Sequence, residues 1–183
     1  MLELLQVASA TFVLMLLAGL AWAYGARREL ADLGRACDHA WDHVERLLRR
    51  RDEGLGPFLT LCEGAVGDDG PALLRQLAEA RGRLASATSA HERARASGDV
   101  SAALRRVLAA ALKRPLLPEG FPERKAQLEE TEAQLADWSE SYDLAVRRWN
   151  AQLTRVPDSL VAKLVKAQPR DSWRLPMAGG DSE

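Results

Sequence analysis

Two histidines and a cysteine near the end of the first quarter of the chain have side chains that could do chemistry. His39 and His43 are four residues apart, so on a helix both project from one side, as in helical metal sites. Cys37 falls on the apolar face of the same predicted helix, where a reduced cysteine packs as a small hydrophobic residue. A closed zinc site needs four ligands, and neither Cys37 nor Cys62 has a partner at a ligand spacing. We therefore predict no metal site and place the histidines on the polar flank of the helix.

Arginines follow at Arg46 and Arg49–Arg51 and raise the question of nucleic-acid binding. Such binding needs a broad basic surface and, for single strands, aromatic rings that stack on the bases. Here Glu45, Asp52 and Glu53 adjoin the arginines, and the chain carries 25 Lys and Arg against 26 Asp and Glu. We therefore predict no nucleic-acid partner and interpret the arginines as a solvated helix face with intrahelical ion pairs. Contact with lipid headgroups is the main alternative.

The remaining candidates for catalysis or cofactor binding are His91, Glu129, Glu130, Glu132, Trp138, Tyr142 and Trp149. The histidine lies at an apolar helix position, which is typical of a core or interface histidine. The glutamates look like solvated helix surface, and the aromatic residues recur at the spacing of a buried helix face. The sequence contains no GxSxG, HExxH or phosphate-loop motif. We therefore predict no catalytic residue, no cofactor and no enzymatic activity.

The N-terminal residues 1–25 differ in kind from the rest. Residues 4–25 contain no charged side chain and, at ~1.5 Å per residue, reach about 33 Å, enough to cross a hydrocarbon core. Trp22 and Tyr24 at the end of this run suit the headgroup layer. We predict a transmembrane anchor over residues 1–25 that contacts the bilayer through residues 4–25. A cleaved signal peptide is the alternative because Ala21–Ala23 resembles a cleavage site, but the run is too long and lacks a basic n-region.

Charges at the two ends of this run predict its orientation. Arg27 and Arg28 follow the span and Glu3 precedes it. Because positive charge stays on the cytoplasmic side, we expect the large C-terminal part in the cytoplasm. The opposite topology would give a periplasmic domain, released or lipid-tethered after cleavage.

The rest of the chain predicts helices almost throughout, because Ala, Leu, Arg and Glu dominate and no alternating strand pattern occurs. Apolar residues from Leu30 to Leu47 recur three and four apart, the repeat of a seam buried against another helix. Glycines and a proline predict a break or a sharp kink at Gly54–Phe58. A second helix is expected from Pro71 to Ala94, and Ser97–Asp99 should separate it from a third.

The third helix is expected over Val100–Lys113, before a proline-rich linker. The last long helix should begin near Pro122 and end at Pro157, with an apolar residue at every seventh position: Leu128, Leu135, Tyr142, Trp149 and Val156. Asp158 is placed to cap a short following helix. Residues 169–183 show no periodicity and are predicted to form a flexible tail. The predicted fold is all-α: a single transmembrane helix, then a bundle of long antiparallel helices over residues 26–168.

A series of motifs between about residues 30 and 165 resembles the LemA family. The motifs are "AWDHVERLLRRRDEGLGPFL", "AEAR", "EGFPERK", "LEETEAQLA", "YDLAVRRWN" and "VPDSLVAKL". Three positions depart from the family pattern: Phe58 and Asp143 each stand where Asn is usual, and Arg124 stands where Leu is usual. The chain therefore resembles a divergent member.

The resemblance implies a membrane-anchored bundle of antiparallel helices at the bacterial inner membrane, with a short N-terminus outside and a cytosolic domain. The family has no settled biochemical activity. We therefore expect a non-catalytic scaffold or adaptor that binds protein partners, or associates with itself, through its helix seams. The alternative is an accessory or regulatory subunit of a membrane enzyme such as a protease.

Overall fold

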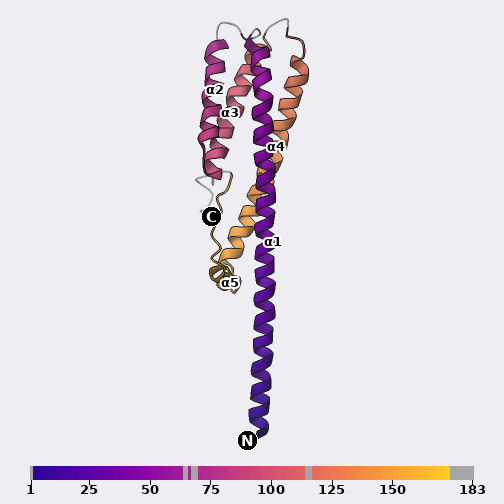
Figure 1. Cartoon of the computed structure of the whole chain (residues 1–183), viewed down its shortest axis with the longest axis vertical. Helices are drawn as coiled ribbons and strands as arrows, with labels where there is room; N and C mark the ends of the chain where they lie inside the picture. The colour runs from indigo at the N-terminus through magenta and orange to yellow at the C-terminus, as the bar shows by residue number, and fades with distance from the viewer. Residues whose placement is uncertain (1, 64–65, 67–69, 114–116, 174–183) are drawn as a thin grey trace, which may run out of the picture. The chain divides into compact units, whose positions relative to one another are not determined.

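The computed structural model describes residues 2–63, 66, 70–113 and 117–173, and within these residues it contains helices and turns without a β-strand. The helices are α1 (Leu2–Glu63), α2 (Gly70–Ser86), α3 (Ala90–Ala111), α4 (Phe121–Thr154) and α5 (Asp158–Leu164) (Figure 1). Among the described residues, only α1 is long and apolar enough to cross a membrane. The predicted all-α fold with an apolar N-terminal helix is confirmed.

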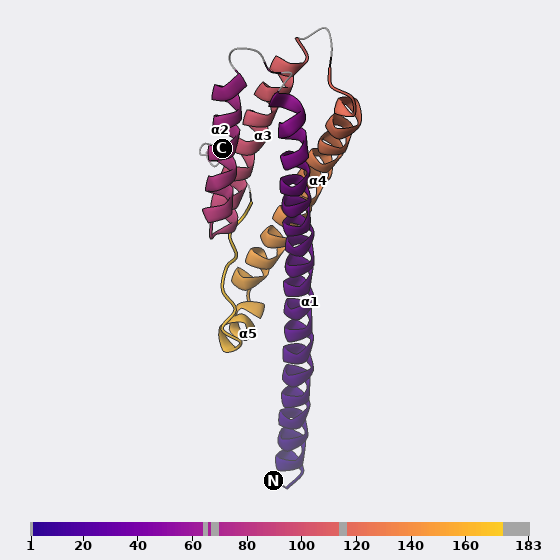
Figure 2. The same cartoon turned by 45° about the horizontal axis from the view of Figure 1, so that its top comes forward.

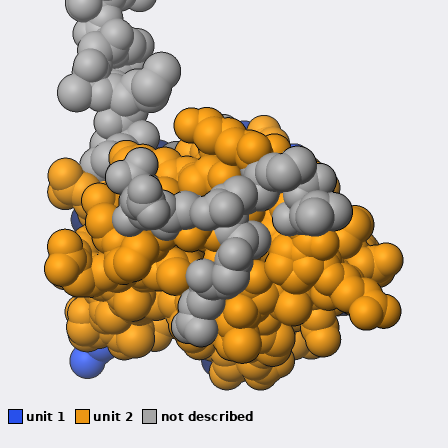
Figure 3. Space-filling view, turned by 90° about the horizontal axis from the view of Figure 1, so that it is seen from above, with its two compact units in different colours: residues 1–38, 145–170 blue, residues 39–144, 171–183 orange. Residues whose placement is uncertain are grey.

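The chain divides into two compact units, which Figure 3 shows in different colours. Unit 1 comprises Met1–Asp38 and Ala145–Arg170, and unit 2 comprises His39–Leu144 and Asp171–Glu183. Helices α1 and α4 each contribute residues to both units.

Unit 2 is the helical bundle. Helices α2 and α3 lie side by side in it and run in opposite directions (Figures 1 and 2). Here α1 is antiparallel to α4, since Trp41 contacts Tyr142 and, further along α1, Arg51 contacts Glu132. The core between the helices includes Leu55, Phe58, Leu77, Val100, Val107, Phe121 and Leu128. Burial of these apolar side chains is the main source of stability for the bundle.

Helix α1 continues through Gly54–Phe58, so the predicted break is wrong. Pro57 lies inside the helix, although it has no N–H to donate to the carbonyl four residues earlier. Leu55 and Phe58, on either side of it, are 1% and 0% exposed. Their burial in the core of unit 2 offsets the lost hydrogen bond and keeps this part of the chain helical.

The predicted division between the second and third helices is also wrong. Helix α2 ends at Ser86, and α3 runs unbroken from Ala90 through Ser97–Asp99. Ser89 is the N-cap of α3: its Oγ accepts from the N–H of Glu92, and the Glu92 carboxylate accepts from the N–H of Ser89. This reciprocal pair satisfies two N–H groups that a helix start leaves unpaired, and so it places the boundary here.

Helix α4 confirms most of the predicted seven-residue repeat. Leu128, Leu135, Tyr142 and Trp149 are buried, but Val156 is 79% exposed because α4 ends at Thr154. Helix α5 then begins at Asp158, which forms no side-chain cap. The Asp158 carboxylate instead accepts a hydrogen bond from Gln152 Nε2 at 2.8 Å.

Unit 1 combines the first part of α1 with the end of α4, α5 and residues 165–170. The Trp149 ring lies against Gly34, where an added Cβ would be 3.3 Å from Trp149 Cζ3. The residues after α5 return to α4: Trp149 Nε1 donates to the carbonyl of Gln168, and Asn150 pairs with both backbone groups of Arg170. These bonds fix the chain that follows α5.

The beginning of the predicted flexible tail is packed. In unit 2, the hydroxyl of Tyr142 donates to the carbonyl of Asp171, and Asp143 Oδ1 accepts from Ser172 Oγ and from the N–H of Trp173. Trp173 is 8% exposed. The prediction of a flexible tail is therefore wrong for these first residues, and residues 174–183 lie outside the described part of the chain.

Candidate functional site

The two histidines lie on α1 in unit 2 and pack against Trp138 of α4. The His43 ring stacks on Trp138 with centroids 3.7 Å apart and planes inclined by 1°, and the His39 ring is 4.7 Å from that of His43. Desolvation lowers the pKa of His43, and the charge of Arg46 lowers it further. A neutral, stacked imidazole contributes to packing. Within the residues that the structure describes, no group of three or more His, Cys, Asp or Glu side chains could hold a metal ion.

The two cysteines belong to different units, Cys37 to unit 1 and Cys62 to unit 2. Both are free thiols with 0% exposure. Burial raises the pKa of Cys37, and it raises the pKa of Cys62 to about 11. Because the thiolate is the reactive form, both side chains have the properties of structural core residues rather than nucleophiles.

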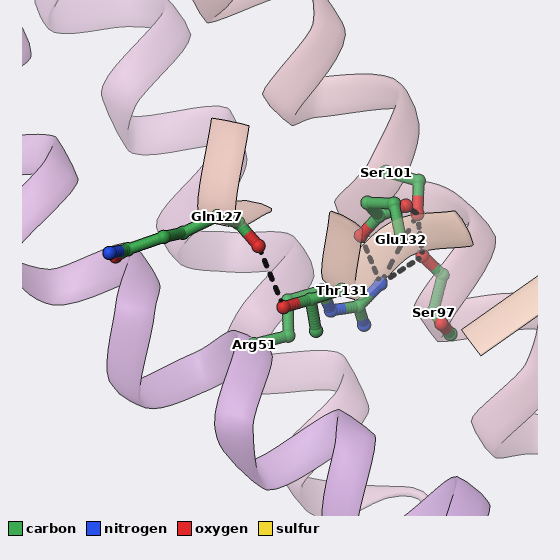
Figure 4. A network of polar contacts seen from close by, with 6 residues as sticks. All are labelled: Arg51, Ser97, Ser101, Gln127, Thr131 and Glu132. Atoms are coloured by element: carbon green, nitrogen blue, oxygen red, sulfur yellow. Dashed lines mark hydrogen bonds and ion pairs between the residues drawn. The ribbon is translucent and has the colours of Figure 1, made fainter. Parts of the chain in front are cut away.

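Arg51 does not belong to a solvated face, contrary to the prediction for Arg49–Arg51. Its side chain is 1% exposed, and it joins three helices of unit 2 (Figure 4). Arg51 Nη1 is 3.0 Å from Glu132 Oε1 on α4, and it donates to the carbonyl of Ser97 and to Ser101 Oγ on α3. Ser101 Oγ also donates to Glu132 Oε2 at 2.5 Å. The arrangement balances a buried positive charge with one carboxylate, so its role is structural.

The other arginines of this run follow the prediction more closely. Arg46, Arg49 and Arg50 are exposed. Arg49 makes an intrahelical pair with Glu45, with Nη2 and Oε2 4.0 Å apart. Such an exposed pair contributes at most about 1 kcal/mol to stability.

The glutamates on α4 and His91 form no common site among the described residues. Glu129 pairs with Lys125, and Glu130 accepts from Gln134, as expected for solvated helix surface. Glu132 differs because it is bound to Arg51 and Ser101. His91 is half-buried near the start of α3.

The aromatic residues of α4 pack as core residues. Tyr142 and Trp149 are buried, and the Tyr142 ring lies 5.2 Å from the ring of Trp41 on α1. Trp138 is half-buried beneath His43. These contacts support the interpretation of this helix face as a core seam rather than a cofactor box.

A groove of about 300 Å³ lies on the surface of unit 2, between α1, α2 and α3. Leu48 and Leu84 supply apolar surface, and two ion pairs border it. Arg93 Nη1 is 2.6 Å from Glu45 Oε1, and Arg81 Nε is 2.7 Å from Asp52 Oδ1. The complete lining is Glu45, Leu48, Arg49, Asp52, Arg81, Leu84, Ala85 and Arg93. An apolar floor with charged borders suits contact with a protein surface, and these lining residues include no nucleophile.

Two structural features were missed by the sequence reasoning. Arg51 lies four residues after Leu47 and four before Leu55, so a strict count along the seam would have placed it on the buried face. The partners of Asp143 lie about thirty residues later in a segment without periodicity, so no local pattern indicates them.

Over the residues that the structure describes, these observations define an all-helical fold with one candidate membrane span and a helical bundle. A model of the LemA family matches residues 40–181, and the chain belongs to this family. A comparison with curated proteins finds no match to the chain.

Proposed function

We propose that this protein is a non-catalytic scaffold or adaptor anchored by α1 in the bacterial inner membrane, with its helical bundle in the cytoplasm. The observation that carries the anchor is the exposure of large apolar side chains along the start of α1. Phe12, Leu14 and Leu17 are 64%, 66% and 58% exposed. Only 6% of the most apolar window of α1 is buried. The hydrocarbon core of a membrane would remove these side chains from water, whereas outside a membrane they would stay exposed to it at a cost in free energy.

The proposed orientation is supported by the basic residues that follow the apolar run. Arg27 and Arg28 are exposed on α1 at the end of this run. Positively charged residues beside a span favour the cytoplasmic side. The bundle follows in sequence and is therefore assigned to the cytoplasm.

The orientation is tested with C-terminal fusions to alkaline phosphatase and to a fluorescent protein, expressed separately in cells. A cytoplasmic bundle gives fluorescence and inactive phosphatase. Active phosphatase would place the bundle outside the cytoplasm and contradict the proposal.

The scaffold role is supported by the groove between α1, α2 and α3, which offers apolar surface between two ion pairs. We expect it to receive a helix of a partner protein with an apolar stripe and charged flanks. A photo-crosslinking residue at Ala85, in the groove, should capture protein in cells, whereas the same residue at exposed Ala133 on α4 should not. Equal capture at both positions would contradict docking in the groove. A single stoichiometric adduct at Ala85 would favour an accessory subunit of a membrane enzyme over a scaffold with several partners.

The non-catalytic assignment has its own test. Replacing His39, His43 and His91 together by Ala removes the imidazoles that could act in acid–base catalysis. We expect cellular function to be retained, with some loss of thermal stability because the stack of His43 on Trp138 is removed. Loss of function in a variant that remains folded at the growth temperature would overturn the assignment.

A further inference from the structure

We propose that α5 and the turns beside it lie on the surface of the membrane that α1 spans and contact anionic lipid headgroups. The inference rests on the proposed membrane anchor and adds a second contact of the chain with the same bilayer. Three lines of observation carry it: an uncovered apolar face, the place of α5 within unit 1, and the charge around it.

The apolar face consists of Val156, Leu160 and Leu164, which are 79%, 63% and 83% exposed. They are spaced four residues apart, so Leu160 and Leu164 share one side of α5. Val161 and Ala162 on its other side are 7% and 3% exposed. One face of α5 therefore packs within unit 1, and a second apolar face remains uncovered.

The position of α5 follows from the packing of α4 on α1 in unit 1. Trp149 lies against Gly34, and α4 runs in the opposite direction to α1 in this unit (Figure 1). Helix α4 ends five residues after Trp149, which at ~1.5 Å per residue brings Thr154 about 7–8 Å closer to the N-terminus of α1. This is the level of residues 26–30 of α1, directly after the apolar run 4–25. Figures 1 and 2 both show α5 next to the end of α4.

Burial on α1 agrees with this position. Ala26 and Leu30 are 7% and 5% exposed, although the residues between them, 27–29, are exposed. The other segment of unit 1 is Ala145–Arg170, which contains α5. The uncovered face of α5 therefore belongs to a segment packed where the proposed span leaves the bilayer.

The charges around this face are mainly positive. Arg155, Lys163 and Lys166 are exposed. Asp158 is the only acidic residue between positions 155 and 168, and its carboxylate already accepts from Gln152. Exposed apolar side chains flanked by Lys and Arg are the chemistry of an interfacial segment on anionic lipid, where each basic residue strengthens partitioning about fivefold.

The test uses the full chain reconstituted in vesicles of phosphatidylcholine and phosphatidylglycerol, with an environment-sensitive fluorophore on one introduced cysteine. The test position is Leu164→Cys. Leu17→Cys reports the span, and Leu112→Cys is the matched control, an exposed leucine of unit 2 (52% exposed). Cys37 and Cys62 are buried, so we expect them to react little with the fluorophore. The chain without an added cysteine measures this background labelling. The quencher is a lipid that carries a nitroxide, either near its headgroup for position 164 or midway along its acyl chain for position 17, and both forms are used for position 112.

We expect a blue-shifted, quenched signal at positions 17 and 164 and an unquenched signal at position 112. Quenching at position 17 without quenching at 164 would overturn the inference and leave the anchor standing. A blue shift at 164 without quenching would mean that protein covers α5, and would also overturn it. Quenching at neither position would overturn both the anchor and the inference.

A charge-reversal variant tests the lipid chemistry. Lys163→Glu together with Lys166→Glu removes two basic residues from the segment and should weaken its partitioning about 25-fold or more. The quenching at position 164 should then be lost on anionic vesicles, while that at position 17 is retained. Unchanged quenching at 164 would contradict a contact with anionic headgroups. Equal helix content by circular dichroism shows that the variant is folded.

Discussion

Arg51 has the largest fully buried side chain among the described residues, and its hydrogen bonds explain why the core of unit 2 accepts it. Its Nη1 group is bound to Glu132 and to two oxygens of α3, whereas Nη2 is buried with no hydrogen-bond partner among the described residues. A buried ion pair contributes little compared with well-packed apolar side chains, but removing one partner leaves the other uncompensated. The consequence can be measured with single and double substitutions.

We expect Arg51→Ala to lower the free energy of unfolding by about 2–4 kcal/mol, somewhat less than for a fully buried pair because the Glu132 side chain is 27% exposed. The matched control Arg50→Ala, at an exposed position one residue earlier, should change it by less than about 0.5 kcal/mol. Replacing both Arg51 and Glu132 by Met should restore much of the loss. The measurement is urea unfolding of the full chain in detergent, followed by circular dichroism. Equal effects at positions 50 and 51 would contradict the burial of Arg51.

We expect the free energy of unfolding to depend on pH through the thiol of Cys62. Burial raises its pKa from 9.0 to about 11 in the folded chain. Below pH 9 the thiol is protonated in both states and favours neither. Between pH 9 and 11 the unfolded chain releases the proton and the folded chain keeps it, so the free energy of unfolding falls as pH rises. Two pKa units correspond to a loss of about 2–3 kcal/mol. The loss should be smaller in Cys62→Ala, and identical pH profiles for the two chains would contradict it.

At the scale of elements, Pro57 tests whether α1 is continuous. In a helix interior, proline costs about 3 kcal/mol relative to alanine because it lacks an N–H and crowds the preceding turn. Pro57 is exposed, so its removal sacrifices little packing. We expect Pro57→Ala to raise the free energy of unfolding by about 1–3 kcal/mol. The control Gly82→Ala, inside α2 where an added Cβ meets nothing, should raise it by about 0.5–1 kcal/mol. No gain at position 57 alongside a gain at 82 would indicate that α1 breaks there.

The helix boundaries show which information in the sequence was local and which was not. The seven-residue repeat of α4 predicted its buried face from Leu128 to Trp149, because one packing period determines the whole element. The start of α3 is also locally encoded, in the pair Ser89 and Glu92, whereas the prediction placed a helix boundary at the glycine in position 98. Glycine lowers helix propensity by about 1 kcal/mol, which the burial of Ala96 and Val100 outweighs.

The roles of single residues depended on contacts between distant segments. The packing of Trp173 and its hydrogen bond to Asp143 join residues about thirty positions apart, and Arg51 meets Glu132 about eighty positions away. Periodicity predicts which face of a helix is buried but not which polar group will be found opposite. For this reason the fold was predictable from the sequence, whereas the ion-pair network and the docked C-terminal residues were not.

At the scale of the whole molecule, exposed apolar surface differs between two settings, the start of α1 and unit 2. Along the start of α1 six successive large apolar side chains, Phe12–Leu17, are exposed between Val7 and Leu20, whereas in the described part of unit 2 the exposed large apolar residues are separate, such as Leu112 and Leu144. Isolated exposed leucines are ordinary in water-soluble proteins, but a continuous run of this length is not. Charge introduced into the two settings should therefore have different consequences.

We expect Leu14→Lys together with Leu17→Lys to move the chain from the membrane fraction to the soluble fraction or to abolish its accumulation. Each lysine at the centre of a span costs about 2.5–3.5 kcal/mol on insertion scales, enough in pairs to cancel the favourable contribution of the remaining apolar residues. The matched control carries Leu112→Lys and Leu144→Lys, at leucines of unit 2 that are 52% and 43% exposed, and should stay with the membrane. The measurement is the amount of chain that resists extraction at alkaline pH. If both double variants resist extraction equally, something other than the apolar part of α1 holds the chain on the membrane, and the bundle or α5 becomes the place to search for that attachment.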